Sequence, residues 1–195
     1  GRSNACSFNV TVTDDENPSI SCPPNVVQTA DAGVCEAAVS VRVATAADNC
    51  GIATLTNDFN NTSDASGTYP VGTTTVVWTA TDDSGNTSTC SMTVTISDDE
   101  DPTLTCPANV TEDITSGNSA VINGIDPTAA DNCGPVTTSY TLSFGGGGNG
   151  TASGTTFPLG TSTVTYTATD ADGNTSTCSF TVTVRFVTQD LIDCP

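Results

Sequence analysis

Acidic side chains gather in two short runs whose composition suits the binding of a cation. One run is Asp14–Glu16 and the other is Asp98–Asp101, and a proline follows each closely. Calcium takes about six to eight oxygen ligands, commonly from several carboxylates, and aspartates in turns can supplement each run. We therefore predict calcium as a cofactor, with these candidate ligands: Asp14, Asp15, Glu16, Asp98, Asp99, Glu100, Asp101, Asp82, Asp170 and Asp172.

Two further features bear on this calcium prediction. The pairs Asp48–Asn49 and Asp131–Asn132 offer additional oxygen atoms. The stretch Asp170–Asn174 begins like an EF-hand loop but lacks the later glutamate, so the sequence excludes an EF-hand. In the alternative interpretation, the acidic runs are solvated linkers that discourage aggregation between sheet edges.

The chain contains nine cysteines and no histidine. Zinc-type CxxC pairs are absent, so the cysteines favour disulfides and an extracellular setting, either secreted or on the cell surface. Without histidine, no Ser-His or Cys-His nucleophile can be built. The carboxylates cluster at turns and junctions, an arrangement that does not favour the paired acids of a glycosidase. We therefore expect no enzymatic activity.

The charge balance restricts the partners of the chain. Against 22 acidic residues stand three basic ones, which gives a formal net charge of −19. Nucleic acid is excluded as a partner because almost no cations are available to displace its counterions. No apolar run is long enough for a membrane-spanning helix, so membrane insertion is not expected. The expected partners are copies of the same protein, adjacent modules of one chain, and glycans.

The elements that must position these residues recur along the chain. One strand pattern occurs three times, at Cys6–Val12, Cys90–Ile96 and Cys178–Val184, with apolar residues alternating with serine, threonine or asparagine. A second landmark, ISCP, LTCP or IDCP, begins at residues 20, 104 and 192. Repetition at a fixed period indicates a tandem array of modules. We expect a preceding module's last strand or a donor strand at 1–13, β-sandwiches at 14–98 and 99–186, and a following module or linker at 187–195.

The strands next to this repeated pattern supply the expected core. Trp78 and Tyr166 occupy matched apolar positions in threonine-rich strands, so we expect them to fill the two cores. The glycine-rich segment Gly145–Gly150 is interpreted as a flexible hairpin tip, because no strand or helix follows it in a phosphate-binding arrangement. The chain has no initiating methionine, so we expect it to be processed or to belong to a longer protein.

An ordered set of motifs gives the chain a family resemblance. The first copy reads ISCPPN, GVC, ATAADNCG and YPVGTTTVVWTATDDSGNTSTC, and the second reads LTCPAN, PTAADNCG and FPLGTSTVTYTATDADGNTSTC. This order is similar to hyalin-repeat (HYR) modules over nearly the whole chain. The resemblance implies an all-β fold of tandem immunoglobulin-like antiparallel β-sandwiches, adhesive or structural roles outside the cell, and no catalytic residues. In the second copy Ser119 stands where the first has Cys35.

The sequence alone leaves the disulfide connectivity open. Because cysteines of the first and last strands occur in both modules, we pair Cys22 with Cys90 and Cys106 with Cys178. Cys35 and Cys50 would then pair, and Cys133 lacks its usual partner. The two cysteines near the chain ends belong to incomplete modules and are candidates for bonds between subunits: Cys6 and Cys194.

Two interpretations of the terminal segments stay open. Cys6–Val12 has an apolar face and no module of its own to bury it, and a sheet edge that accepts a foreign strand is an established mode of assembly. Head-to-tail contacts that do not close give filaments. Alternatively, the chain is a segment cut from a longer array.

Seven asparagines open Asn-x-Ser/Thr sequons, which mark candidate sites of glycosylation. An asparagine- and threonine-rich chain also produces such sequons by chance. The seven are Asn9, Asn60, Asn61, Asn86, Asn109, Asn149 and Asn174.

These observations favour a structural repeat unit of an extracellular fibre, filament or long surface adhesin, assembled head to tail through terminal strands. The alternative function is that of a calcium-dependent adhesion module that binds carbohydrates or cells, which predicts an exposed aromatic platform or a calcium site at a loop end.

Overall fold

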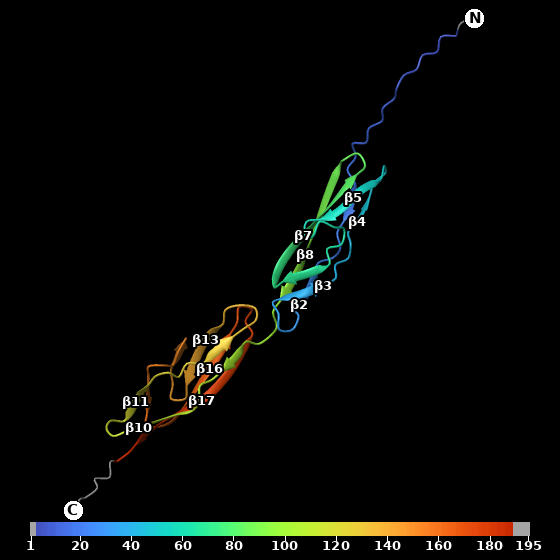
Figure 1. Ribbon diagram of the computed structural model, residues 1–195. Helices are drawn as coiled ribbons and strands as arrows, with labels where there is room; N and C mark the ends of the chain where they lie inside the picture. The colour runs from blue at the N-terminus through green and yellow to red at the C-terminus, as the bar shows by residue number, and fades with distance from the viewer. Residues whose placement is uncertain (1–2, 189–195) are drawn as a thin grey trace, which may run out of the picture. The chain divides into compact units, whose positions relative to one another are not determined.

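The computed structural model describes residues 3–188, which divide into two compact units (Figure 1). Unit 1 runs to Asp31 and resumes at Glu36–Ser97. Unit 2 takes the four-residue loop Ala32–Cys35 together with the chain from Asp98 onward. No helix that could span a membrane occurs within residues 3–188.

Unit 1 is built entirely from β-strands. Its main sheet has the order β2-β8-β7-β5, and two smaller sheets pair β1 with β4 and β3 with β6. The strands of unit 1 are β1 (Ser19–Ser21), β2 (Val26–Thr29), β3 (Glu36–Val39), β4 (Thr45–Ala47), β5 (Ile52–Asn57), β6 (Gly67–Pro70), β7 (Gly72–Asp82) and β8 (Thr87–Ser97).

Unit 2 repeats this topology. Its main sheet has the order β10-β17-β16-β13-β14, and the smaller sheets pair β12 with β9 and β11 with β15. The strands of unit 2 are β9 (Thr103–Thr105), β10 (Val110–Ile114), β11 (Ser119–Ile122), β12 (Thr128–Ala130), β13 (Thr137–Leu142), β14 (Gly147–Asn149), β15 (Thr155–Pro158), β16 (Gly160–Thr169) and β17 (Thr175–Phe186).

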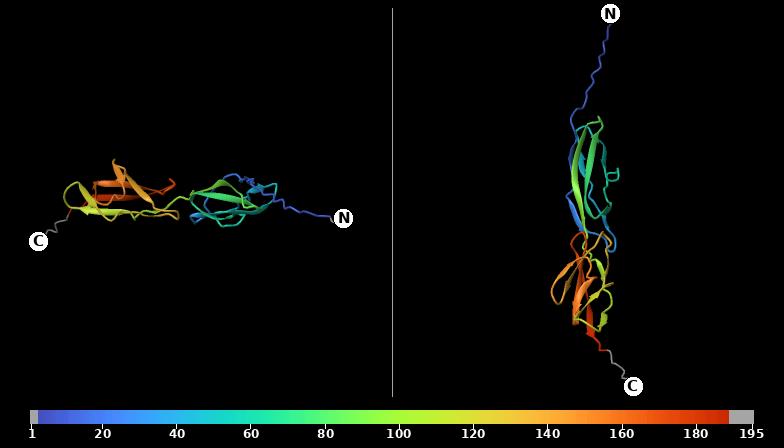
Figure 2. Two further views of the ribbon diagram at one scale, coloured as in Figure 1. Left: turned by 90° about the horizontal axis from the view of Figure 1, so that it is seen from above. Right: turned by 90° about the vertical axis from the view of Figure 1, so that its left-hand side faces the viewer.

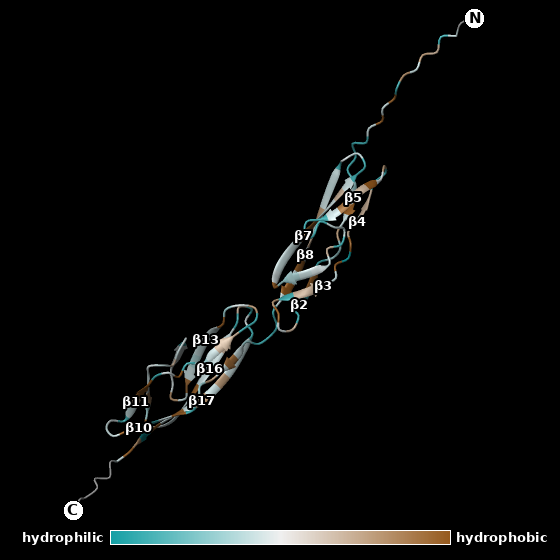
Figure 3. Ribbon diagram, in the orientation of Figure 1, coloured by the Kyte–Doolittle hydropathy of each residue, from teal (hydrophilic) through white to brown (hydrophobic). Residues whose placement is uncertain are grey.

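The longest strand pairs, β7 with β8 and β16 with β17, run along their units (Figures 1 and 2). β-branched threonines keep the strand propensity high while apolar residues alternate onto the inner face. In β8 the inner face is Met92, Val94 and Ile96, each buried. Apolar residues lie on the strands and hydrophilic ones dominate the connections (Figure 3). The predicted all-β fold is confirmed.

The two cores form around large aromatic side chains, as the sequence predicts. Trp78 and Tyr69 are fully buried in unit 1, and Tyr166 and Phe157 hold the matching places in unit 2. Each core is a separate cluster of apolar side chains. Each unit therefore buries apolar surface of its own, which is the main favourable contribution to its folding.

Two disulfides tie the start of each unit to its last strand, in agreement with the predicted pairing. Cys22 follows β1 and bonds to Cys90 in β8, with 5.7 Å between the Cα atoms. Cys106 follows β9 and bonds to Cys178 in β17, with 5.8 Å between the Cα atoms. Just after each of these cysteines, β2 pairs in parallel with β8, and β10 with β17. The start of each unit is thus joined to the last strand by a covalent bond and, through β2 or β10, by hydrogen bonds.

The structure bears on two expectations about local elements. Cys6–Val12 runs as an extended segment without a paired strand among the described residues (Figure 1), so its role as the last strand of a preceding module or as a donor strand stays a prediction. The segment Gly145–Gly150 does contain a hairpin tip, but its later part is strand β14, which pairs with β13. Glycine therefore does not prevent regular pairing at Gly147–Asn149.

The predicted match of Ser119 with Cys35 also needs correction. Glu36 pairs with Pro70, and Ser119 pairs with the matching Pro158. Val26 and Val110 hold matching places on the last strands, and the stretch from Val110 to Ser119 is one residue shorter than that from Val26 to Glu36. Counting along the sequence therefore misplaces the match by one. Asn118, and not Ser119, stands in the place of Cys35.

The Cys22–Cys90 bond makes a testable contribution to the stability of unit 1. Replacing both cysteines by alanine is expected to lower the free energy of unfolding of unit 1 by about 4 kcal/mol, because the bond restricts a long loop of the unfolded chain. Urea unfolding followed by the fluorescence of Trp78, the single tryptophan, measures unit 1 alone.

The matched control removes Cys106 and Cys178 in the same way. Since the cores are separate clusters, the Trp78 transition should keep its midpoint in this control. Equal shifts in the two double variants would contradict the independence of the units, and no shift in either would contradict the contribution of the bond.

Candidate functional site

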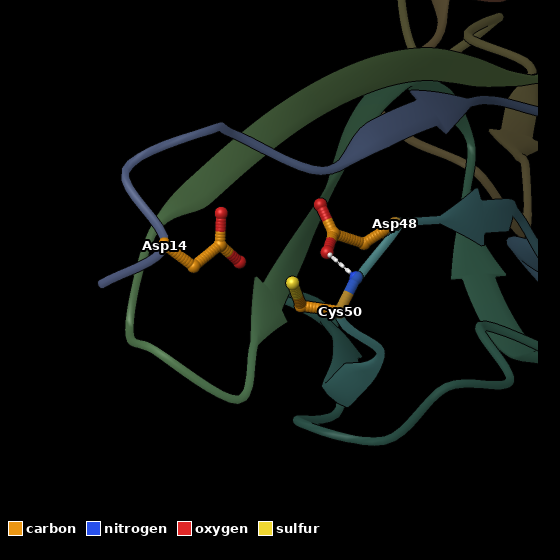
Figure 4. A group of neighbouring side chains, drawn as sticks. All are labelled: Asp14, Asp48 and Cys50. Carbon is orange, nitrogen blue, oxygen red and sulfur yellow. Dashed lines mark hydrogen bonds between the residues drawn. The ribbon is translucent and has the colours of Figure 1, made fainter. Parts of the chain in front are cut away.

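An acidic cluster lies at one end of unit 1, where the incoming chain meets the connection that follows β4. Asp14, Asp48 and Cys50 point toward one another (Figure 4), and their carboxylate oxygens and sulfur lie within 4.8 Å of each other. The Asp48 carboxylate accepts a hydrogen bond of 2.8 Å from the backbone N–H of Cys50, which fixes the turn. Asp14 accepts one of 3.2 Å from the backbone N–H of Glu16.

Unit 2 contains the same cluster in Asp98, Asp131 and Cys133, again with ligand atoms within 4.8 Å of each other. The Asp131 carboxylate accepts a hydrogen bond of 2.6 Å from the backbone N–H of Cys133. Asp98 accepts one of 3.1 Å from the backbone N–H of Glu100. The two DNC motifs and the two acidic runs of the sequence thus build one arrangement twice.

Three carboxylate oxygens in these clusters are buried without a hydrogen-bond partner. They are Oδ2 of Asp14, Oδ2 of Asp98 and Oδ1 of Asp131. Asp98 is only 5% exposed. A buried carboxylate oxygen without a donor or cation costs free energy, because water solvated it in the unfolded chain. The residues fit a hard cation, which prefers oxygen ligands.

The thiols beside these carboxylates are held in the neutral form. Desolvation raises the pKa of Cys50, and the hydrogen bond and charge of Asp14, then the charge of Asp48, raise it further. Desolvation likewise raises the pKa of Cys133 well above its usual range, with contributions from Cys35 and Asp98. Zinc binds cysteine as the thiolate, and a raised thiol pKa disfavours that form. The clusters therefore suit oxygen-binding cations better than zinc.

Two of the predicted calcium ligands have another role in the structure. Asp82 and Asp170 are buried, and burial alone would raise the pKa of each carboxyl. Hydrogen bonds from the side chain of Asn86 or Asn174 and from the backbone N–H groups of each turn together outweigh this effect, so both pKa values are lowered. Each carboxylate caps its own turn, with four hydrogen bonds at Asp170 and three at Asp82.

The turns capped by these two aspartates also hold the acidic clusters in place. The side-chain amide of Asn86 donates to the backbone oxygen of Asp14 at 3.3 Å, and that of Asn174 donates to the backbone oxygen of Asp98 at 3.2 Å. Asp82 and Asp170 thus position the cluster backbone through these asparagines. No sequence pattern pointed to this indirect role.

The remaining acidic candidates lie around the clusters with their side chains more accessible. Glu16 accepts a hydrogen bond of 2.9 Å from the side chain of Asn49, and Glu100 accepts one of 2.8 Å from Asn132. These contacts close the turns that carry the DNC motifs. The exposed members are Asp15, Asp99, Asp101 and Asp172.

The predicted bond between Cys35 and Cys50 is wrong. Both cysteines are unpaired in the structure, and they belong to different units, Cys35 to unit 2 and Cys50 to unit 1. Their shared membership of one sequence repeat had implied a proximity that the fold does not provide. Cys6 is exposed and unpaired, and Cys194 lies outside the described residues.

The sequons fall into two groups by their surroundings. The side-chain amides of Asn86 and Asn174 donate hydrogen bonds inside the capped turns, and the side chain of Asn60 donates to the backbone of Asp64 at 2.7 Å. Glycosylation at these three would break these bonds. Glycosylation therefore stays a prediction that applies best to the exposed members Asn9, Asn61, Asn109 and Asn149.

The family resemblance is confirmed by comparison with known proteins. The model of the HYR domain matches residues 13–96 and 97–184. Hyalin from Strongylocentrotus purpuratus is 39% identical over 134 residues, which cover 66% of this chain and 11% of that protein. The chain thus spans about a tenth of the length of this relative. The family match and the disulfides indicate an extracellular, adhesion-type repeat, a class that is generally not enzymatic.

Solved structures with similar β domains include extracellular cadherin domains 3–6 of protocadherin gamma B2, with 17% identity and a TM-score of 0.44, covering 86% of this chain and 47% of that one. Fibronectin(III)-like modules of Clostridium thermocellum CbhA share 16% identity at a TM-score of 0.35, covering 87% of this chain and 94% of that one. At such scores these likenesses assign no function to the chain.

The raised pKa of Cys50 predicts slow alkylation. A raised pKa leaves less thiolate at a given pH, so the variant Asp14→Asn, which removes the nearest charge, is expected to increase the alkylation rate at pH 8 severalfold. The rate is followed at the Cys50 peptide by mass spectrometry with iodoacetamide. Asp15→Asn is the matched control on an exposed neighbour. Equal rates in the two variants would show that Asp14 does not act on the thiol.

Proposed function

The chain belongs to the HYR family, and on that premise we propose that it is a structural repeat segment of an extracellular fibre or long surface adhesin, with calcium bound at the acidic end of each repeat. The observation that carries the calcium proposal is the repeated cluster with buried, unpartnered carboxylate oxygens. Glycans on the exposed sequons would add to the solubility of such a fibre.

Electrostatics supports a cation at these ends. The chain carries a net charge of −19, and each cluster holds two aspartates whose ligand atoms lie within 4.8 Å. The two carboxylates repel each other at this separation in a partly buried site. A divalent cation between them would attract both and offset this repulsion. The benefit is largest where desolvation is greatest, which is at Asp98 in unit 2.

Coordination chemistry favours calcium among the common cations. Calcium tolerates irregular geometry and completes its shell with water and backbone oxygens, whereas magnesium demands a near-ideal octahedron. In unit 1, Asp14 and Asp48 would supply the protein carboxylates of such a shell. The neutral Cys50 thiol would lie beside the ion without coordinating it.

Assembly is the second part of the proposal. In the extended N-terminal segment, Phe8 is 83% exposed, Val10 73% and Val12 90%. Burying three such side chains would gain roughly 1.5–3 kcal/mol each in the apolar-transfer estimate. The occupant of this face would be the sheet of a second copy of the chain, to which residues 6–12 would add a strand.

Calcium is expected to raise the melting temperature of the full chain, because a ligand that binds only the folded state stabilises it. At a concentration of 100 times the dissociation constant, the gain is about 2.7 kcal/mol, or on the order of ten degrees for a domain of this size. Differential scanning calorimetry with calcium and with EDTA measures the shift.

The calcium-dependent shift should be lost selectively in variants. Asp98→Asn should abolish the shift of unit 2 and Asp14→Asn that of unit 1, whereas Asp99→Asn, on an exposed neighbour, should keep both. A melting profile that is the same in calcium and EDTA would overturn the calcium proposal. It would leave the assignment as an HYR structural repeat untouched.

Assembly through the N-terminal segment predicts concentration-dependent oligomers of the full chain. Val10→Asp places a charge on the apolar face of the segment and is expected to shift the sedimentation profile to monomer. Thr11→Asp adds the same charge on the opposite face and should retain the oligomers. A monomer at all concentrations in the unmodified chain would contradict assembly through these residues.

A further inference from the structure

We propose that Cys35 and Cys133 form a disulfide, which would covalently tie the Ala32–Cys35 loop of the first HYR repeat to the DNC turn of the second. This inference goes beyond the proposed function and is independent of calcium binding and of strand exchange. It replaces the Cys35–Cys50 pairing that the structure contradicts.

The contacts of the loop place it against the turn that carries Cys133. Ala32–Cys35 belongs to the same compact unit as Asp98 and the chain that follows it. The backbone N–H of Gly33 donates to Glu100 at 2.8 Å, and Glu100 also accepts from the side chain of Asn132, the neighbour of Cys133. One carboxylate therefore links the loop that carries Cys35 to the turn that carries Cys133.

The sulfur of Cys133 lies on the peptide group adjacent to Cys35. Its thiol donates to the backbone oxygen of Val34 at 3.9 Å, and that carbonyl belongs to the peptide bond that joins Val34 to Cys35. The Cys133 sulfur therefore contacts the peptide group next to the residue with which the bond would form.

The surroundings of Cys133 are compatible with a disulfide at this position. Cys133 is half-buried, and its sulfur and the carboxylate oxygens of Asp98 and Asp131 lie within 4.8 Å of one another. The bond would remove the thiol proton from a half-buried acidic site. The carboxylates of Asp98 and Asp131 would remain available for a cation.

The loop itself is shaped for this contact. Gly33 has a φ of +76°, a left-handed conformation that a side chain would disfavour. Its Cβ position meets no atom within 4 Å, so the backbone conformation and not crowding explains the glycine. The tight turn at Gly33 presents the N–H to Glu100 and leaves Cys35 just beyond it.

The cysteine count fits this connectivity. Cys22, Cys90, Cys106 and Cys178 are already bonded, and Cys50 belongs to the other unit. Cys133 is therefore the described cysteine that shares a unit with Cys35 and is unpaired. The second repeat has Asn118 in the place of Cys35 and needs no partner there.

Formation of the bond is an oxidation of two thiols. Cys35 and Cys133 together lose two protons and two electrons as the S–S bond forms. A disulfide oxidant, either an oxidoreductase or a small-molecule disulfide, accepts the electrons and is reduced to two thiols. The same class of oxidant forms the Cys22–Cys90 bond in an oxidising compartment.

The test is disulfide mapping of the full chain, produced by secretion into an oxidising compartment. Free thiols are blocked with iodoacetamide in denaturant, and the chain is digested at acidic residues without reduction. The expected product is a peptide pair that joins Cys35 to Cys133 and separates on reduction. The remaining pairs should be Cys22–Cys90 and Cys106–Cys178.

Two serine variants make the mapping decisive. Cys35→Ser should render Cys133 alkylatable, whereas the matched control Cys50→Ser should leave Cys133 protected. Alkylation of both Cys35 and Cys133 in the unmodified chain, or a peptide that joins Cys35 to Cys50, would overturn the proposal. Because none of these readouts involves calcium or assembly, failure here is separable from failure of the proposed function.

Discussion

The antiparallel pairing of two long strands is the constraint on which each unit depends. β7 pairs with β8, and β16 with β17, over ten residue pairs, and along much of each strand apolar residues alternate with threonine or serine, so that one face is solvated and the other is buried. A slip of one residue would turn Met92, Val94 and Ile96 outward. The same register fixes the cysteine of the last strand and the turn between the strands, where Asp82 or Asp170 sits.

From this pairing the chemistry of the acidic end follows. The turn between the two long strands presents Asn86 or Asn174, which holds the backbone of the entering chain at Asp14 or Asp98. The DNC motif then brings a second carboxylate and a thiol to the first. Under the two proposals, the carboxylates would bind a hard cation, and in unit 2 the Cys133 sulfur would bond to that of Cys35. The two uses are compatible because they need different atoms.

The periodicity of the sequence predicts the features that depend on the alternation of side chains along a strand. Alternation identified the inner face of β8 and the core positions of Trp78 and Tyr166, and repetition identified the Cys22–Cys90 bond. Periodicity carries no information on which loops meet in space, so the Cys35–Cys50 pairing was wrong. It also cannot distinguish a carboxylate that caps its own turn, such as Asp82, from one left without a donor, such as Asp98. Cys6–Val12 has the pattern of a strand, but a strand requires a neighbour.

The position of the Cys22–Cys90 bond determines how a repeat would respond to tension along the chain. A pull on both ends passes from Cys22 directly to Cys90 and bypasses the 68-residue separation between them. Those residues, which include most of the core, carry no load. Without the bond, these residues could extend by on the order of 200 Å when the repeat unfolds under force, and the bond prevents that extension. With its disulfide intact, such a repeat would act as a nearly inextensible link.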